Sequence, residues 1–293
     1  MKQAVVTGGA GFVGSHLCAE LVRRGVEKVV SIDNYLSGSR KNHHPGVEYI
    51  EGHTKDIARL IDFTPDIVFH LGEYARVEQS FDDIGLVLDC NITGTAAVVE
   101  FCHTRNVKLL YAGSSTKFGD GGLARQQSPY AWTKAANTEL VSNFGRWFGL
   151  RYAITYFYNV YGGAEIRQGK YATLIGLFKE RYRTGLPLAV VEPGTQERNF
   201  THIDDIISAL VLVGEQGEGD DFGIGSAEAF SVLDVARMFD TPIEMLPPRA
   251  GNRMTAEVRT ERTRALGWQP TRLLPDHIQA FKRECEARAV ANG

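Results

Sequence analysis

A tyrosine and a lysine that could work together in acid–base catalysis stand four residues apart, at Tyr130 and Lys134. They follow Ser128-Pro129, a pair typical of a helix start, so the spacing places both side chains on one helix face. A free tyrosine is a weak base at neutral pH because its hydroxyl titrates at about pH 10, and a neighbouring lysine cation favours the phenolate. Tyr-x-x-x-Lys is common by chance, so this pair needs support from its surroundings.

The segment just before this pair supplies further candidate groups. Lys108–Gly113 is an apolar stretch typical of a strand, and the hydroxyl residues Ser114, Ser115 and Thr116 follow it. A hydroxyl at a strand end can hold the reacting oxygen of a substrate beside the tyrosine. Serine and threonine are also ordinary turn residues, so a structural role still fits one or two of the three.

A second chemical signal lies in the segment Thr7–Gly14, where Gly8, Gly11 and Gly14 recur at every third position. The segment follows a β-branched stretch and leads into an apolar-periodic one. Glycines at this spacing allow a tight turn, a close approach to a pyrophosphate, and close packing of the next helix on the sheet. The first turn of that helix offers unpaired N–H groups and a positive dipole end to phosphates.

Asp33 supports a dinucleotide site, because it ends the predicted second strand nineteen positions after Gly14. A carboxylate there would accept hydrogen bonds from a ribose 2′-hydroxyl and repel a 2′-phosphate, which favours NAD over NADP. Arg40 and Lys41 follow closely and leave that preference open. With strand, helix and Asp33 in register, we expect a bound NAD.

The bulk composition is that of an ordinary globular protein. The chain has 293 residues, of which 43% are hydrophobic and 23% charged, and its formal net charge is −3. These values give no electrostatic case for nucleic acid or an anionic membrane as a partner. The four cysteines show no CxxC pairing, and Cys18, Cys90 and Cys102 lie in apolar surroundings, so we expect reduced core residues and neither a zinc site nor a disulfide framework.

We expect a cytoplasmic protein. The first predicted strand begins at Lys2, which leaves no room for a signal peptide, and we find no apolar run long enough to span a bilayer.

The first half of the chain alternates short apolar strands with longer amphipathic segments. The expected strands are Lys2–Thr7, Lys28–Ile32, Val47–Glu51, Asp66–His70, Lys108–Gly113 and Arg151–Tyr156, and the expected helices are Gly11–Arg24, Leu86–Arg105 and Ser128–Phe148. This alternation predicts an α/β fold, a doubly wound parallel Rossmann sheet with a smaller C-terminal substrate-binding lobe.

The pattern changes after Tyr161-Gly162-Gly163. We expect a helix over about Lys170–Thr184, a strand at Leu188–Val191, a turn at Pro193-Gly194, a helix Asp205–Gly214 capped by Asp204, and helices Ser231–Phe239 and Pro275–Ala291. The predicted division is an NAD-binding domain over 1–162 with a returning segment near 199–225, and a substrate-binding lobe over 163–198 and 226–293.

The chain resembles the extended short-chain dehydrogenases/reductases, and among them the NAD-dependent nucleotide-sugar epimerase/dehydratase family, including UDP-glucose 4-epimerases. The resemblance runs almost end to end. It is carried by Thr7–Gly14, Asp33-Asn34, Asp56-Ile57, His70-Leu71-Gly72, Asn91 in Asn-Ile-Thr-Gly-Thr, Ser114, Tyr130 and Lys134, Asn159-Val160-Tyr161-Gly162, Arg198-Asn199-Phe200-Thr201-His202 and Leu266-Gly267-Trp268. Several ordered motifs at the right separations are far more specific than any one alone.

The resemblance implies a role for each matching residue. Ser114, Tyr130 and Lys134 would form a catalytic triad. The cofactor would be held by Gly8, Gly11, Phe12, Val13, Gly14, Asp33, Asn34, Asp56, Ile57, Leu71, Gly72 and Asn91, together with Tyr130 and Lys134. The substrate would contact Ser115, Thr116, Asn159, Arg198 and Arg249, with the two arginines on its diphosphate. For three of the matching residues a structural role is favoured over direct chemistry: Asn91 could hold a helix in place through hydrogen bonds, and His202 and Asp204 are expected to be cap and packing residues.

Three neighbouring residues are unusual for the family. Glu73, Tyr74 and Arg76 occupy a loop in which its members tend to have small residues. Their side chains would lie near the mouth of the active site, where they could recognise the sugar or form a surface ion pair.

Other departures bear on the reaction. Family 4,6-dehydratases carry an Asp-Glu pair where this chain has Ser115 and Thr116, which cannot transfer protons near neutral pH, so loss of water by that route is disfavoured. Tyr156 stands in place of a common arginine, and Asn199 and Asn252 replace usual aspartates. These changes leave the sugar open.

The resulting hypothesis is an NAD-dependent nucleotide-sugar 4-epimerase that works through a transient 4-keto sugar. The alternatives are a C4 dehydrogenase or 4-keto-sugar reductase, then a dehydratase, and more remotely a non-catalytic NAD-sensing protein. The substrate would be a nucleotide-diphosphate sugar, and the resemblance implies a homodimer built on the Leu86–Arg105 and Ser128–Phe148 helices.

Overall fold

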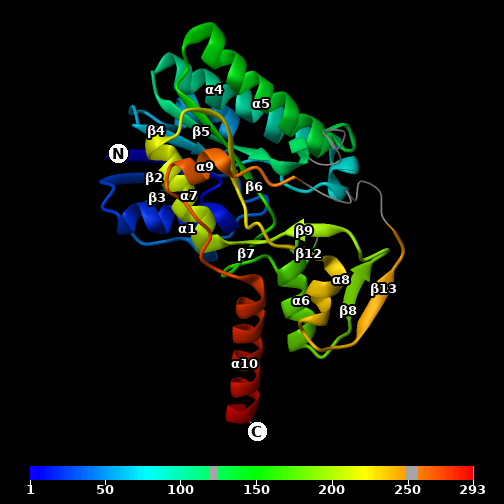
Figure 1. Cartoon of the computed structure of the whole chain (residues 1–293). Coiled ribbons are helices and arrows are strands. Elements are labelled where there is room, and N and C mark those ends of the chain that lie inside the picture. Colours follow the sequence, from blue (N-terminus) through cyan, green and yellow to red (C-terminus); the bar gives the residue numbers. More distant parts are fainter. Residues whose placement is uncertain (119–124, 170, 249–256, 293) are drawn as a thin grey trace.

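A seven-stranded parallel sheet forms the centre of the molecule (Figure 1). The computed structural model describes residues 1–118, 125–169, 171–248 and 257–292. In spatial order the strands are β11 (Gly219–Ile224), β6 (Tyr152–Phe157), β5 (Lys108–Ser114), β4 (Ile67–His70), β1 (Gln3–Thr7), β2 (Lys28–Asp33) and β3 (Val47–Glu51). Every neighbouring pair is parallel, as the predicted βαβ crossovers require.

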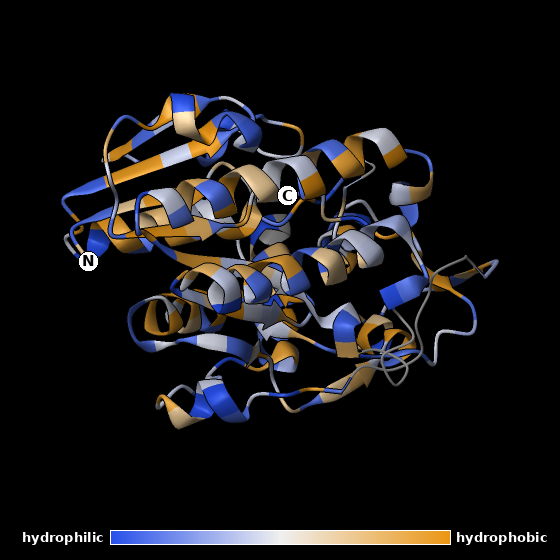
Figure 2. Ribbon diagram, turned by 90° about the horizontal axis from the view of Figure 1, so that it is seen from above, coloured by the Kyte–Doolittle hydropathy of each residue, from blue (hydrophilic) through white to orange (hydrophobic). Residues whose placement is uncertain are grey.

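Helices cover both faces of this sheet (Figure 1). On one face α1 (Phe12–Arg23) and α7 (Ile203–Gln216) bury apolar residues such as Leu17 and Leu210. On the other face are α2 (Ile57–Leu60), α4 (Gly94–Thr104) and α5 (Pro129–Phe148). Figure 2 shows hydrophobic and hydrophilic residues alternating along the helices in view, as expected for helices with one buried face.

The helix predicted over Leu86–Arg105 is one continuous helical stretch, Ile84–Thr104, made of α3 (Ile84–Val87), a π-helical segment η4 (Leu88–Thr93) and α4. By length and composition alone it could cross a membrane, contrary to the expectation from the sequence. It also contributes Val98, Val99 and Phe101 to the core, as helices inside globular proteins do.

A smaller lobe has its own apolar core. Its elements are α6 (Leu174–Arg183), β8 (Leu188–Val191), α8 (Val232–Arg237), β13 (Ile243–Leu246) and α10 (Leu274–Asn292). β8 pairs with β13 in parallel, and Phe178, Phe239 and Ile278 are buried together between these elements. In Figure 1 α10 extends away from the sheet and ends at the C-terminus.

Short elements connect the two parts. β7 (Val160–Tyr161) pairs with β10 (Thr201–His202), and β9 (Glu197–Asn199) pairs with β12 (Ala229–Ser231). α9 (Glu261–Ala265) packs on β11. Four 3-10 turns complete the described chain: η1 (Arg40–Asn42), η2 (Thr54–Asp56), η3 (Glu78–Phe81) and η5 (Ser115–Phe118).

Two predicted helix starts are wrong. α7 begins at Ile203, and its cap is His202, whose ring accepts a hydrogen bond from the backbone N–H of Asp204. Asp204 therefore lies in the first turn, where its charge favours the helix dipole. α6 begins at Leu174 and not near Lys170, because Thr173 caps it through the N–H of Gly176.

Candidate active site

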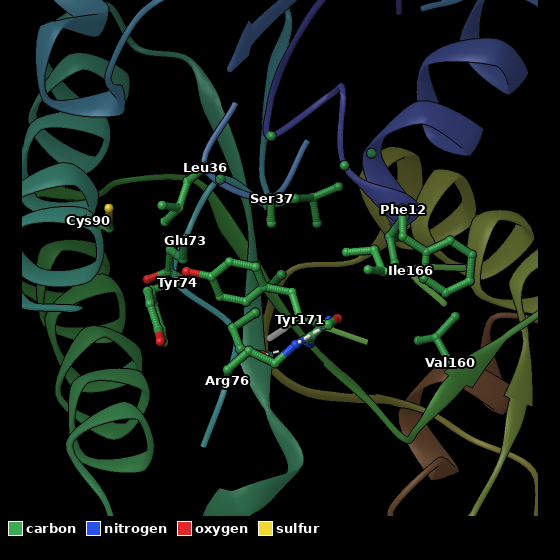
Figure 3. A pocket seen from close by; sticks show the side chains of 18 of the residues that line it. Phe12, Leu36, Ser37, Glu73, Tyr74, Arg76, Cys90, Val160, Ile166 and Tyr171 are labelled. Atoms are coloured by element: carbon green, nitrogen blue, oxygen red, sulfur yellow. Dashed lines mark hydrogen bonds between the residues drawn. The ribbon is translucent and has the colours of Figure 1, made fainter. Parts of the chain in front are cut away.

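Two adjoining cavities open at the carboxyl ends of the parallel strands. The first has a volume of about 510 Å³ and is lined by the glycine turn, the end of β2 and the loop after β4 (Figure 3). The second has a volume of about 570 Å³ and lies between the end of β5 and the smaller lobe. Tyr130 lines both cavities.

The glycine turn shapes the wall of the first cavity. Gly8 has φ +74°, and a Cβ atom at Gly14 would lie 2.1 Å from the carbonyl oxygen of Gly8, so no side chain fits there. Gly11 caps α1 and makes no side-chain cap hydrogen bond, which leaves the first-turn N–H groups available to a ligand. This cradle fits a pyrophosphate.

Asp33 lies at the end of β2 in the same cavity. Its carboxylate accepts hydrogen bonds from the N–H of Ala10 at 2.9 Å and of Tyr35 at 2.8 Å, which fixes its orientation. Burial raises the pKa of the Asp33 carboxyl, while these two hydrogen bonds act in the opposite direction. Arg40 pairs with Glu51 at 2.5 Å, so it is already engaged by a carboxylate.

Most of the predicted cofactor residues meet in this cavity. The lining includes Gly8, Gly11, Phe12, Val13, Gly14, Asp33, Asn34, Leu71, Gly72, Tyr130 and Lys134. The sequence reasoning missed His53 and Thr54, which line the wall from the loop after β3, and Tyr171, which precedes α6. Arg76, which was expected near the mouth of the active site, also lines this cavity.

Three predicted cofactor residues do not line the cavity. Ile57 is a core residue, and Asp56 is turned outward beside Arg59. Asn91 is fully buried: its side chain accepts from the N–H of Tyr74 at 2.7 Å and donates to the oxygens of Tyr74 and Thr133. Asn91 therefore holds the loop after β4 against the neighbouring helices, which is the structural role given above as the alternative to cofactor binding.

The proposed catalytic tyrosine and lysine lie on the first turns of α5. Ser128 caps this helix by accepting from the N–H of Ala131 at 3.1 Å, and Pro129 occupies the first helical position. Lys134 lies one turn after Tyr130 and faces the first cavity. Ser114, at the end of β5, lines the second cavity with Tyr130.

Lys134 forms a buried ion pair that the sequence did not predict. Its ammonium group donates to the carboxylate of Glu73 and, at 2.6 Å, to the carbonyl oxygen of Ala112. The Lys134 side chain is 8% exposed and that of Glu73 is 1% exposed. Glu73 therefore forms a buried pair and not a surface pair, and it also contributes to the lining of the first cavity.

A chain of polar contacts continues from Glu73 into the sheet. The Thr95 hydroxyl donates to Glu73 at 2.8 Å, and Nε2 of His70 lies 2.9 Å from the Thr95 hydroxyl oxygen. Since Thr95 uses its only proton on Glu73, His70 must donate through Nε2 and accept through Nδ1 from the Thr7 hydroxyl at 2.7 Å. Burial lowers the pKa of His70 to about 4, which agrees with this neutral form.

The other two unusual residues have separate roles. The Tyr74 hydroxyl is bound to Asp83 at 2.7 Å, and burial, the larger effect, together with this carboxylate raises the pKa of Tyr74. Arg76 projects into the first cavity and donates to the carbonyl oxygens of Tyr171 and Ala75 (Figure 3). It thus connects the loop after β4 to the segment that precedes α6.

The second cavity collects most of the predicted substrate residues. Ser115, Thr116, Asn159 and Arg198 line it together with Ser114. The Asn159 side chain, just before β7, donates to the carbonyl oxygen of Asn199 in β9 at 2.9 Å. The prediction for Arg249, like the departure at Asn252, falls outside the described residues.

Comparisons with known proteins agree with this geometry. Residues 4–225 match the family model described as the NAD dependent epimerase/dehydratase family. The UDP-glucose 4-epimerase of Mycolicibacterium smegmatis is 27% identical, over 94% of this chain and 96% of its own length. A UDP-N-acetyl-alpha-D-glucosaminuronate decarboxylase from Bacillus cytotoxicus is 28% identical, over 80% of this chain and 78% of its own.

Among solved structures, the Thermus thermophilus UDP-glucose 4-epimerase in complex with NAD superimposes with a TM-score of 0.83. It is 29% identical, over 94% of this chain and 99% of that chain. The chain belongs to the NAD-dependent epimerase/dehydratase family. It is an NAD-dependent enzyme of the nucleotide-sugar epimerase class or a close relative of that class, and its cofactor is NAD.

Proposed function

We propose that the protein is a nucleotide-sugar 4-epimerase. The observation that carries the proposal is the position of Tyr130, which lines both the cavity that fits NAD and the adjoining cavity with Ser114 and Arg198. A base at this junction is within reach of a sugar hydroxyl on one side and a nicotinamide on the other. Relatives named UDP-glucose 4-epimerase support the same reaction.

The chain's own residues would divide the work as follows. Bound NAD supplies a hydride acceptor that later returns the hydride, so no net oxidation occurs. The Tyr130 hydroxyl oxygen takes the proton of the sugar's C4 hydroxyl. It gives the proton back after the 4-keto sugar has rotated to present its other face. Ser114 donates a hydrogen bond to the same sugar oxygen, and Lys134 directs its ammonium group to the cofactor side.

The turning of the sugar requires firm anchors on the diphosphate. Arg198 lies in the wall of the second cavity, where its planar group can grip phosphate oxygens, and we assign Arg249 the same task from the sequence resemblance. A cavity of about 570 Å³ has room for a hexose to present either face.

The alternative of a 4,6-dehydratase finds less support. Ser115 and Thr116 occupy the wall of the second cavity in place of an acid–base pair. Neither hydroxyl can remove a C5 proton near neutral pH.

Mass spectrometry of products is the experiment that tests the proposal. The purified protein would be incubated in heavy water with a panel of nucleotide sugars, including UDP-hexoses and their uronic acids. An isomer of unchanged mass and shifted retention supports the 4-epimerase. Loss of one water indicates a dehydratase, loss of carbon dioxide a decarboxylase, and a change of two hydrogens with cofactor turnover a one-way oxidoreductase. No reaction with any sugar would leave the NAD-sensing alternative.

We also propose a cytoplasmic homodimer and the division of the chain given by the sequence. The helices proposed for the dimer interface expose four large apolar side chains, which are Leu86 of α3 and Trp132, Trp147 and Phe148 of α5. Trp147 is 59% exposed, and exposed apolar groups of this size are expected where a second copy binds. The burial of Cys18, Cys90 and Cys102 suits a reducing compartment. The separate core around Phe178 supports a substrate-binding lobe over 163–198 and 226–293.

A further inference from the structure

In the described part of the chain, every hydrogen-bond partner of the Glu73 carboxylate is a donor. The Lys134 ammonium, the Thr95 hydroxyl, the Tyr111 hydroxyl at 3.2 Å and the Asn137 amide at 2.8 Å all donate to its two oxygens. A protonated carboxyl would bring a donor to one of these contacts, so the arrangement holds the anion. The buried Glu73 carboxylate, with its four donors, therefore contacts Lys134, the lysine one helical turn from the proposed base Tyr130.

The two contacts of Lys134 determine where its third N–H points. One N–H goes to Glu73 and one to the carbonyl oxygen of Ala112, and Lys134 still lines the first cavity. An ammonium group has three N–H donors, so one remains for a ribose hydroxyl of the cofactor. Without Glu73 the flexible lysine stem would lose the partner that selects this rotamer.

We propose that Glu73 is a positioning residue of the catalytic site, which fixes the Lys134 ammonium group and offsets its charge beside Tyr130. The proposal rests on the proposed function, because it assigns Tyr130 the role of the base. It explains why a carboxylate is present in this loop, where the resemblance implies a small residue.

Other charged and titratable groups face the same place. Arg76 lines the cavity with Tyr130 and Lys134, and burial lowers its pKa while Tyr130 acts in the opposite direction. Within the described part of the chain the hydrogen bonds of Arg76 end on carbonyl oxygens, so its charge stays uncompensated by a carboxylate. Tyr111 and His70 face Glu73 from β5 and β4, and both are held neutral by burial, since burial raises the pKa of Tyr111 and lowers that of His70.

The balance of charge beside Tyr130 follows from these contacts. Glu73 and Lys134 cancel to first order, so Arg76 and the bound nicotinamide supply the net positive charge that favours the phenolate. Removing the Glu73 charge would leave Lys134 uncompensated and favour the phenolate further. The acid limb of the pH–activity profile would then move to lower pH.

The test is the isosteric substitution Glu73→Gln in the NAD-loaded protein, with Asp82→Asn as the matched control. Asp82 is an exposed carboxylate in the following loop and lines neither cavity. Two readouts are compared: the pH profile of turnover, and the phenolate absorbance of the protein minus that of Tyr130→Phe. The second needs no turnover, so a wrong substrate or reaction leaves this test intact.

We expect both midpoints to fall by about one pH unit in Glu73→Gln, the size typical for a nearby charge, and to stay unchanged in Asp82→Asn. Unchanged midpoints with only a lower melting temperature would reduce Glu73 to a packing role and overturn the proposal. A shift to higher pH would also overturn it, because Glu73 would then act by keeping Lys134 protonated.

Glu73→Asp keeps the inference testable if Glu73→Gln does not fold. The shorter carboxylate retains the charge but reaches Lys134 poorly, so we expect kcat to fall about tenfold with unchanged midpoints, in line with the sensitivity of catalysis to small misplacements. An unchanged kcat in this variant would contradict a positioning role.

Discussion

Replacing Gly14 by alanine tests the turn that holds the cofactor. The new Cβ atom would lie 2.1 Å from the carbonyl oxygen of Gly8 and 2.9 Å from Cα of Gly9. Both are backbone atoms, so the turn must move by about 1 Å to restore van der Waals contact. Overpacking of this kind costs about 1–3 kcal/mol. If the strain falls on the NAD-binding conformation, the affinity for NAD drops about 5- to 150-fold.

The assay is a titration of the cofactor-free protein with NAD, followed by intrinsic fluorescence or calorimetry, with urea unfolding of the same samples. Gly85→Ala is the matched control, because a Cβ atom there meets no atom within 4 Å and the residue lies in α3. It should leave the NAD affinity unchanged and stabilise the fold by about 0.4–1 kcal/mol. Equal NAD affinity in Gly14→Ala and the wild type would refute the close-packed cradle.

Three further predictions follow from buried and exposed groups. Burial lowers the pKa of His70 from 6.5 to about 4, so the unfolded chain takes up a proton at a higher pH than the folded chain does. The free energy of unfolding, measured with urea, should therefore fall by about 3 kcal/mol between pH 6.5 and pH 4, and His70→Gln should reduce this dependence on pH. Asp33→Ser removes a buried acceptor and should weaken NAD binding about tenfold or more while NADP binding is spared, which parallel titrations would measure; an equal loss for both cofactors would count against ribose recognition. Trp147→Glu places a charge on the exposed apolar face and should convert a dimer to a monomer in sedimentation, whereas an unchanged mass would argue for another interface.

The main sheet could be predicted from the sequence because each strand has an apolar run of its own. All six expected strands are observed. Val47–Glu51 has the predicted bounds, and the other five differ from the prediction by no more than one residue at either end. β11 was missed because its first residues, Gly219 to Asp221, are glycine and aspartate; its place in the sheet depends on pairing with β6.

The candidate site could be predicted only where a motif carries it. The glycine turn, Asp33, Tyr130 and Lys134 meet in one cavity as their spacing indicated. The burial of Glu73 could not be foreseen, because its partner Lys134 lies 61 positions further along the chain and only the packing of α5 on the loop brings them together. Equally, either His202 or Asp204 could have capped α7, and the backbone geometry decides for His202.

The central claim is that the hydride removed from C4 returns to the same sugar. It can be tested most directly with nucleotide sugars that carry deuterium at C4, beginning with UDP-glucose and UDP-galactose and their uronic acids, in the presence of excess unlabelled NADH. The account predicts an epimer that keeps its deuterium at C4, and no turnover with Tyr130→Phe. Loss of the deuterium to the free cofactor pool, or conversion that persists in Tyr130→Phe, would contradict it.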